Sequence, residues 1–181
     1  MTTRRVRVYC ADRAPLAPDH DAAEAVLVSH GVIWATLPPR PLPADGGPQR
    51  ALAVWHDVVD ATCLEQGFLS VDVVSVDAST PNVGRLRAEF RDEHVHADEE
   101  TRLFAAGGGV FWLRLRDDEV WAIRTVAGDL LSLPAGLCHG FDMGPSPSFT
   151  AIRFSRDAAG RVPQPTGSPR GPWPEHVDWG W

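Results

Sequence analysis

Two histidines and a glutamate stand close together in the middle of the chain, in the run FRDEHVHADEETRLF. His94, His96, Glu100 and Arg102 share one parity, so on a strand the two imidazoles would point to the same face, about 6.6 Å apart. That spacing allows both rings to bind one metal ion. Because AspGluGlu is a poor strand sequence, we expect a turn between His96 and Glu100 that brings the carboxylate round to the same point.

A second segment, GDLLSLPAGLCHGF, supplies a fourth ligand candidate. Its pattern predicts turn, strand, turn and strand, which places His139 on an adjacent strand facing inward. Three imidazoles and one carboxylate suit Fe(II), Ni(II), Mn(II), Co(II) or Zn(II), and they leave two octahedral positions open for a substrate. Cys138 should face the other side of that strand as a buried structural thiol.

Each of these residues can also be explained by a purely structural or surface role. A lone HisXHis is equally typical of a half-exposed strand with two surface histidines. Glu99 competes with Glu100 as the carboxylate ligand, although parity favours Glu100. Arg102 would place a permanent cation where an anionic substrate needs it, or it is an ordinary surface arginine. Histidines without partner spacing are assigned no role: His20, His30, His56 and His176.

Composition narrows the class of protein. At 181 residues the chain suits one ordinary domain with its own core. A net charge of −7 without a basic cluster argues against nucleic acid or an anionic membrane as partner. Three cysteines without CxxC spacing suggest free thiols, and the N-terminus lacks the apolar core of a secretory signal, so a cytoplasmic location is expected.

The first half of the chain predicts a mixture of helices and strands. Pro48 is well placed to open one helix reaching about Gln66, and a later helix should carry Leu86 and Phe90 toward the core. The expected elements are a strand at Val6–Tyr9, a helix from about Asp21 to His30 stopped by Gly31, a strand at Val32–Leu37, a loop at Pro38–Pro48, the long helix, a strand at Val71–Val76 and a helix at Pro81–Arg91.

From His94 to Ser155 the sequence predicts short strands separated by turn residues. The turns are expected at 107–109, 117–118, 128–129 and 134–136, where Gly, Asp and Pro cluster. Trp112 and Trp121 are more typical of core than of a site. Closely spaced strands favour a barrel or jelly roll, and the Pro-, Gly- and Trp-rich segment beyond Gly160 favours a surface coil.

The runs HVHADEETR, GGGVFWLR, GDLLSLPAGLCHGF and FDMGPSPSFTAIRF, in this order, resemble the acireductone dioxygenases, particularly their bacterial branch. The resemblance is close over the C-terminal half and looser before it, through the order of elements and the GFLSVDVVSV segment. It implies a mainly β fold, the cupin double-stranded β-helix or jelly-roll barrel with N-terminal flanking helices. Residues 1–181 would form one such domain: an α/β flanking segment at 1–91, a metal-binding core at 92–160 and a C-terminal coil at 161–181.

By the same resemblance the metal ligands fall on His94, His96, Glu100 and His139. The family acts in methionine salvage and cleaves 1,2-dihydroxy-3-keto-5-methylthiopentene with O2. With Fe(2+) the products are formate and 2-keto-4-methylthiobutyrate; with Ni(2+) they are formate, carbon monoxide and 3-methylthiopropionate. Arg102 would be the catalytic residue that stabilises the dianionic substrate. The family tends toward monomers.

Further positions match residues near the family's pocket. Phe90, Phe141 and Arg153 would bind substrate, although core packing explains the two phenylalanines equally well. Glu93 and Glu99 match acidic positions suspected of aiding metal incorporation and conformational change. A departure is Arg161, where the bacterial relatives carry a tryptophan, so the back wall of the pocket is expected to differ.

Two other functions fit part of this pattern. The altered residue Arg161 is compatible with another cupin dioxygenase or isomerase that acts on a different enediol or diketone. A non-catalytic cupin that only senses a small molecule would keep the metal or the pocket and show ligand-induced stabilisation without turnover.

Overall fold

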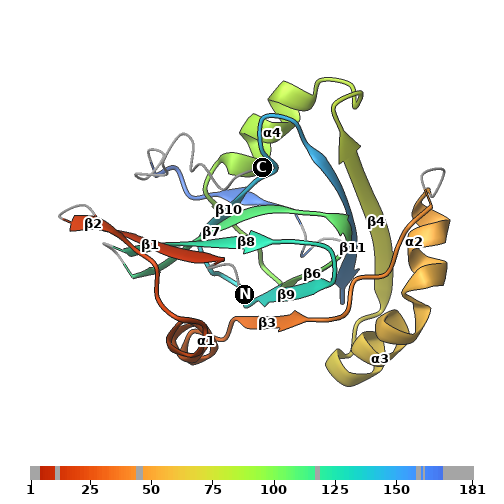
Figure 1. The fold of residues 1–181 in the computed structure, drawn as a ribbon, viewed down its shortest axis with the longest axis horizontal. Helices are drawn as coiled ribbons and strands as arrows, with labels where there is room; N and C mark the ends of the chain where they lie inside the picture. Colours follow the sequence, from red (N-terminus) through yellow and green to blue (C-terminus); the bar gives the residue numbers. More distant parts are fainter. Residues whose placement is uncertain are drawn as a thin grey trace.

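Two antiparallel β-sheets facing each other make up the body of the computed structural model (Figure 1), which describes residues 5–10, 13–43, 47–116, 119–157, 160 and 162–168. The seven-stranded sheet contains, in spatial order, β12 (Gln164–Pro165), β5 (His94–Val95), β10 (His139–Asp142), β7 (Gly109–Arg116), β8 (Glu119–Thr125), β1 (Val6–Cys10) and β2 (Arg13–Leu16). The five-stranded sheet contains β3 (Ile33–Thr36), β9 (Asp129–Leu133), β6 (Glu100–Gly107), β11 (Ser148–Ser155) and β4 (Ser70–Asp77).

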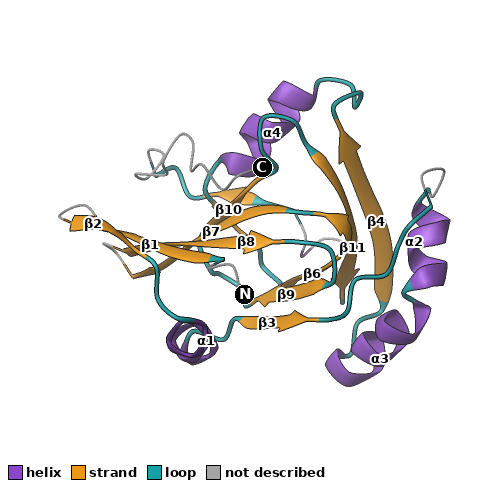
Figure 2. Ribbon diagram, viewed as in Figure 1, coloured by secondary structure: helices purple, strands orange, loops and turns teal. Residues whose placement is uncertain are grey.

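The helices of the described residues, four in number, lie around the sheets rather than between them (Figure 2). They are α1 (His20–Ser29), α2 (Pro48–Val54), α3 (His56–Gln66) and α4 (Val83–Arg91). Helix α1 lies beside β3, α2 packs on β4 and β11, and α4 packs on β10. None of the described helices is long and apolar enough to cross a membrane.

Strand β6 shows how the sequence fills two cores at once. Phe104 belongs to the core between the two sheets, where it meets residues of β7, β10 and β11. Its neighbours Leu103 and Ala105 face the other way, into a second core that Ala51 and Trp55 of the α2–α3 segment cover. Because successive side chains of a strand alternate between faces, a strand covered on both faces is apolar at nearly every position.

The predicted single helix from Pro48 to Gln66 is wrong: it is two helices that meet at Trp55. The indole of Trp55 is fully buried, and its backbone leaves helical geometry at φ −109° and ψ 14°. The carbonyl of Val54 at the end of α2 accepts a hydrogen bond of 2.8 Å from Arg40 in the preceding loop. A partner outside the helix thus satisfies one of the carbonyls that a helix end leaves open.

Most other predicted elements are confirmed within a residue or two, including the turns at Gly107, Gly128 and Gly136, all of which have positive φ. Leu86, Phe90, Trp112 and Trp121 pack on or in the cores as expected. Three points differ from the prediction. Strand β2 was not expected, β12 lies within the segment predicted as coil, and the thiol of Cys138 is partly exposed rather than buried. Arg161, His176, the turn predicted at 117–118 and the predicted coil beyond residue 168 lie outside the described residues.

Candidate metal centre

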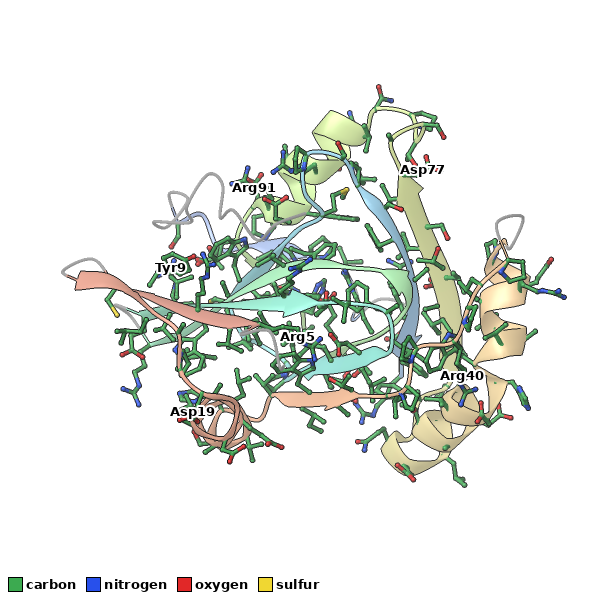
Figure 3. The ribbon with its side chains drawn as sticks, in the orientation of Figure 1. Arg5, Tyr9, Asp19, Arg40, Asp77 and Arg91 are labelled. Atoms are coloured by element: carbon green, nitrogen blue, oxygen red, sulfur yellow. The ribbon has the colours of Figure 1, made fainter. Side chains whose placement is uncertain are left out.

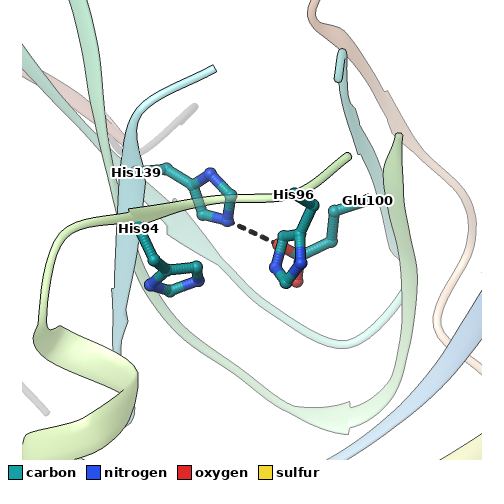
Figure 4. Close-up of side chains that lie close together, drawn as sticks. All are labelled: His94, His96, Glu100 and His139. Carbon is teal, nitrogen blue, oxygen red and sulfur yellow. Dashed lines mark hydrogen bonds and ion pairs between the residues drawn. The ribbon is translucent and has the colours of Figure 1, made fainter. Parts of the chain in front are cut away.

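Three histidines and one glutamate converge between the two sheets (Figure 4). His94, His96, Glu100 and His139 each offer one ligand atom, and these atoms all lie within 4.8 Å of one another. His94 and His139 are directly opposite each other on the paired strands β5 and β10. Glu100 comes from the other sheet, at the first residue of β6. The cluster therefore depends on the two sheets being packed against each other.

Backbone carbonyls orient two of the imidazoles. The Nδ1 of His94 donates to the carbonyl of Asp92 at 2.7 Å, and the Nδ1 of His139 donates to the carbonyl of Leu137 at 2.7 Å. Such bonds fix the tautomer and leave each Nε2 lone pair for a metal. The Nδ1 of His96 is buried and has no hydrogen-bond partner among the described residues.

The charges of the cluster fit a divalent cation. Burial, and then the neighbouring His139, lowers the pKa of His94 to about 4, so this imidazole is neutral at pH 7. Burial alone would raise the pKa of Glu100, but Arg102 and His139 outweigh it and hold the pKa well below its ordinary value. A Glu100 oxygen lies 2.6 Å from the Nε2 of His139, so the carboxylate and this ring nitrogen face the same point, where a shared metal ion would lie. The neutral imidazole of His94, the ionised carboxylate of Glu100 and the rings of His96 and His139 therefore form a metal-binding His/Glu site.

A short turn brings Glu100 rather than Glu99 into the cluster. Residues 97 and 98 bend between β5 and β6, as the AspGluGlu sequence predicted. The amide of Gly136, in the ProAlaGly turn, donates to the carbonyl of His96 at 3.0 Å, which joins the two ligand-bearing segments. The side chain of Glu99 instead forms an ion pair with Arg156.

Arg102 lies beside the cluster, with 8% of its surface exposed. One of its Nη atoms forms an ion pair with Glu100, while Nε and the other Nη are buried without hydrogen-bond partners among the described residues. Its guanidinium lies 5.4 Å from the ring centre of Phe141 and 5.5 Å from that of Phe111. Burial lowers the pKa of Arg102 and Glu100 opposes that shift, but a guanidinium keeps its charge at neutral pH.

A cavity opens on this group of residues. It is lined by His96, Glu99, Glu100, Thr101, Arg102, Arg153 and Phe154. Arg153 is opposite Arg102 in the pairing of β11 with β6, and it donates to both oxygens of Asp72 at 2.7 and 2.8 Å. The cavity is therefore lined by two of the four metal ligands, His96 and Glu100, and by the guanidinium groups of Arg102 and Arg153, a lining that suits an anion bound to the metal.

The other residues singled out in the sequence lie around the cluster. Phe90 and Phe141 pack in the core between the sheets, with their ring centres 6.4 Å apart, and neither lines the cavity. Glu93 is buried outside the cluster, where it accepts hydrogen bonds of 2.8 Å from Arg114 and from Thr166. His30 bonds to the carbonyl of Val26 in the preceding turn of α1, and His56 bonds to the carbonyl of Ala53 in α2.

Sequence reasoning missed Asp72 and Arg156. Both bind a residue of the cavity lining, Asp72 through Arg153 and Arg156 through Glu99. Each is far in sequence from the HisXHis run, and a single Asp or Arg carries no local pattern that could have marked it.

The chain is similar in sequence to known proteins over most of its length. It matches the family model described as ARD/ARD' family over residues 53–163. A relative named acireductone dioxygenase from Xanthomonas axonopodis pv. citri (strain 306) is 39% identical over 173 residues, which cover 91% of this chain and 89% of the relative. Another of that name, from Picosynechococcus sp. (strain ATCC 27264 / PCC 7002 / PR-6), is 39% identical over 164 residues, covering 89% and 92%.

The fold has a solved counterpart. An acireductone dioxygenase from Bacillus anthracis with cadmium ion in its active centre superposes with a TM-score of 0.74 at 25% identity, covering 88% of this chain and 98% of that one. This likeness confirms the predicted mainly β cupin fold. Since the family model covers more than half of the chain and the relatives cover most of it, the chain belongs to the ARD/ARD' family and is a dioxygenase.

Proposed function

We propose that this dioxygenase cleaves 1,2-dihydroxy-3-keto-5-methylthiopentene with O2 in methionine salvage, with one divalent metal per chain. The observation that carries the proposal is the convergence of His94, His96, Glu100 and His139 beside the buried cation of Arg102. The relatives named acireductone dioxygenase support the substrate, and the cadmium ion of the Bacillus anthracis enzyme supports the metal.

In this proposal the four residues hold the metal ion, which supplies Lewis acidity to the enediol oxygens and a site where O2 chemistry is possible. The catalytic residue of the chain itself is Arg102. An acireductone binds as an anion, and a buried guanidinium whose Nε and one Nη have no partner among the described residues stabilises that charge more strongly than one in bulk water. The ion pair with Glu100 fixes the guanidinium beside the ligand cluster.

The Arg153 guanidinium is the second positive group of the cavity and is assigned to substrate binding. Asp72 holds it in a two-point hydrogen-bonded pair, so its direction is fixed even though the pair is partly exposed. For Phe90 and Phe141 we keep the role of pocket residues as a prediction. Phe141 does not line the cavity itself, but its ring lies beside Arg102, which does.

Iron is proposed as the metal of the methionine-forming reaction, giving formate and 2-keto-4-methylthiobutyrate. Nickel is the alternative, giving formate, carbon monoxide and 3-methylthiopropionate. Three imidazoles and a carboxylate accept either ion, because imidazole is a good ligand for both iron and nickel and the metal that is loaded then depends on geometry and metal availability. A monomeric state, a cytoplasmic location and the absence of nucleic-acid or membrane partners stay predictions of the sequence.

The test is elemental analysis of the purified protein, followed by anaerobic loading with Fe(II) or Ni(II) and oxygen-uptake assays with acireductone. We expect near-stoichiometric metal, rapid O2 consumption, formate with both metals, and a second product that changes with the metal. Bound metal without O2 uptake would reject this substrate and favour another cupin substrate or a sensor. Absence of metal binding would reject the site.

A further inference from the structure

The turn between His96 and Glu100 connects ligands that belong to different sheets. His96 follows β5 of the seven-stranded sheet, whereas Glu100 begins β6 of the five-stranded sheet. Only three residues, 97–99, separate them, and their sequence is AlaAspGlu. The shape of this turn therefore sets the separation of two ligand atoms, Nε2 of His96 and Oε2 of Glu100, which lie 3.3 Å apart.

Arg156 binds this turn from the end of β11. One of its Nη atoms forms an ion pair with Glu99 and donates to the Asp98 carboxylate at 3.3 Å. The other Nη donates at 2.7 Å to the carbonyl of Gln66, the last residue of α3. The guanidinium also lies 5.1 Å from the ring centre of Phe68.

These contacts fix the turn from one side. The Asp98 oxygen that accepts from Arg156 also accepts from the amide of Glu99 at 2.9 Å, so the side chain and the backbone of the turn share one hydrogen-bond network. Arg156 connects that network to α3 and Phe68, which belong to the packed α2–α3 layer. A planar guanidinium can bind several acceptors at once in fixed directions, which a lysine ammonium cannot reproduce.

We propose that Arg156 is a positioning residue for the metal: by fixing residues 97–99 it holds His96 and Glu100 at ligand distance and thereby raises metal affinity. The inference rests on the proposed metal site and is independent of the acireductone reaction. Arg156 is 42% exposed, so its ion pairs add little to overall stability. Metal affinity is more sensitive, because residues that orient ligands typically change it by about tenfold to a hundredfold.

Removing Arg156 would also have a second effect, which would strengthen metal binding instead of weakening it. Removing Arg156 leaves Asp98 and Glu99 without its positive charge, and two carboxylates near a cation would attract it. Both carboxylates are 22% exposed, so water and salt screen that attraction to about the size of a surface ion pair. We therefore expect the loss of ligand positioning to dominate.

Arg40 provides a matched control (Figure 3). Its side chain is 35% exposed, against 42% for Arg156. Like Arg156 it pairs with a carboxylate (Asp57), donates to a backbone carbonyl at a helix end (Val54) at 2.8 Å and stacks on an aromatic ring (Trp55) at 4.7 Å. These partners belong to α2, α3 and the residue between them, and among the described residues none of them lies in the turn at 97–99. Removing it should cost similar stability without moving a ligand.

The experiment measures the Ni(II) dissociation constant of wild type, Arg156→Gln and Arg40→Gln by chelator competition, with the Tm of each metal-free protein. We expect Arg156→Gln to weaken Ni(II) binding about tenfold, the lower end of the range because Arg156 contacts the turn and not a ligand. Arg40→Gln should keep the wild-type constant at a similar Tm.

An unchanged or tighter dissociation constant in Arg156→Gln would overturn the proposal, and so would equal weakening in both variants, which would trace metal loss to stability. If Arg156→Gln does not fold, Arg156→Lys replaces it and is judged by the same outcomes, since one ammonium cannot hold the turn and Gln66 together. Wild type that binds no Ni(II) would reject the metal site itself, whereas Ni(II) binding without acireductone turnover would reject only the proposed reaction.

Discussion

At the scale of single residues, Glu100 connects the metal ligands to the proposed catalytic cation. Its carboxylate contacts the Nε2 atoms of His96 and His139 on one side and Arg102 on the other. A carboxylate ligand neutralises part of the charge of a divalent ion, and its second oxygen stays available for Arg102. The two functions assigned to this region, metal binding and anion stabilisation, therefore meet at one side chain.

Replacing Glu100 by glutamine should remove most metal affinity. A neutral amide is a poor ligand for a transition metal. We therefore expect the Ni(II) dissociation constant to rise by more than about a hundredfold, which is the largest effect typical of residues that orient ligands without binding the metal themselves. Chelator competition measures it. Glu99→Gln should weaken binding about tenfold or less, and equal losses in the two variants would contradict the choice of Glu100.

Replacing Arg102 by glutamine should separate metal binding from turnover. We expect the metal content to stay near wild type while kcat for oxygen uptake falls by about a hundredfold to a thousandfold, the usual cost of removing one preorganised donor to a developing charge. Elemental analysis and an oxygen electrode make the two measurements. Arg116→Gln, an exposed arginine of β7, is the control and should keep full activity. Metal loss in Arg102→Gln would show that this arginine acts through Glu100 instead.

At the scale of elements, a buried carboxylate attaches helix α4 to the strand that carries His139. Asp142, the last residue of β10, accepts two hydrogen bonds from Arg87, at 2.7 and 3.0 Å, and lies 3.3 Å from Arg91. Burial raises the pKa of Asp142, but the bonds from Arg87 and from the Gly144 amide outweigh it, and the net shift is downward. The helix and the ligand strand are therefore held in place by a charged pair of low exposure.

Asp142→Asn should destabilise the protein by about 2 kcal/mol, because it leaves Arg87 with a neutral partner in a partly buried site. Since the folded pKa lies below the unfolded value of about 3.9, the stabilisation is fully present above that pH and is lost as the pH falls through the folded pKa. Urea unfolding of both proteins should show a constant difference at neutral and mildly acidic pH that shrinks below about pH 4. A difference that grows on acidification would contradict this assignment.

At the scale of the whole molecule, the metal centre joins the two sheets. His94 and His139 belong to β5 and β10 of the seven-stranded sheet, and His96 follows β5 directly. Glu100 belongs to β6 of the five-stranded sheet. An unfolded chain cannot present these four side chains together, so a bound ion stabilises the folded state and the packing of one sheet on the other.

Metal loading should therefore raise the stability of the entire fold. At a free Ni(II) concentration of about one hundred times the dissociation constant, the free energy of unfolding should rise by about 2.7 kcal/mol, which corresponds to about 5–10 °C in Tm for a chain of this size. Differential scanning fluorimetry with and without chelator measures it, and Glu100→Gln should not respond. An equal Tm for both forms of the wild type would argue against a site that bridges the sheets.

The sequence by itself determined the parts of this protein that depend on local spacing. His94 and His96 are two residues apart, a turn must follow because AspGluGlu disfavours a strand, and ProAlaGly ends one strand and begins the next at His139. Alternation of apolar residues and clusters of Gly, Pro and Asp predicted most of the strands and their turns, because those preferences act over a few residues.

Only the tertiary structure decided the features that depend on contacts between distant segments. The break at Trp55 depends on burial of its indole and on a hydrogen bond from Arg40, and β12 exists because it pairs with the ligand strand β5. Arg156 meets Asp98 from 58 residues away. Long-range pairing is set by how the sheets close and pack, and a lone arginine or a two-residue strand leaves no periodic signal from which that closure could be predicted.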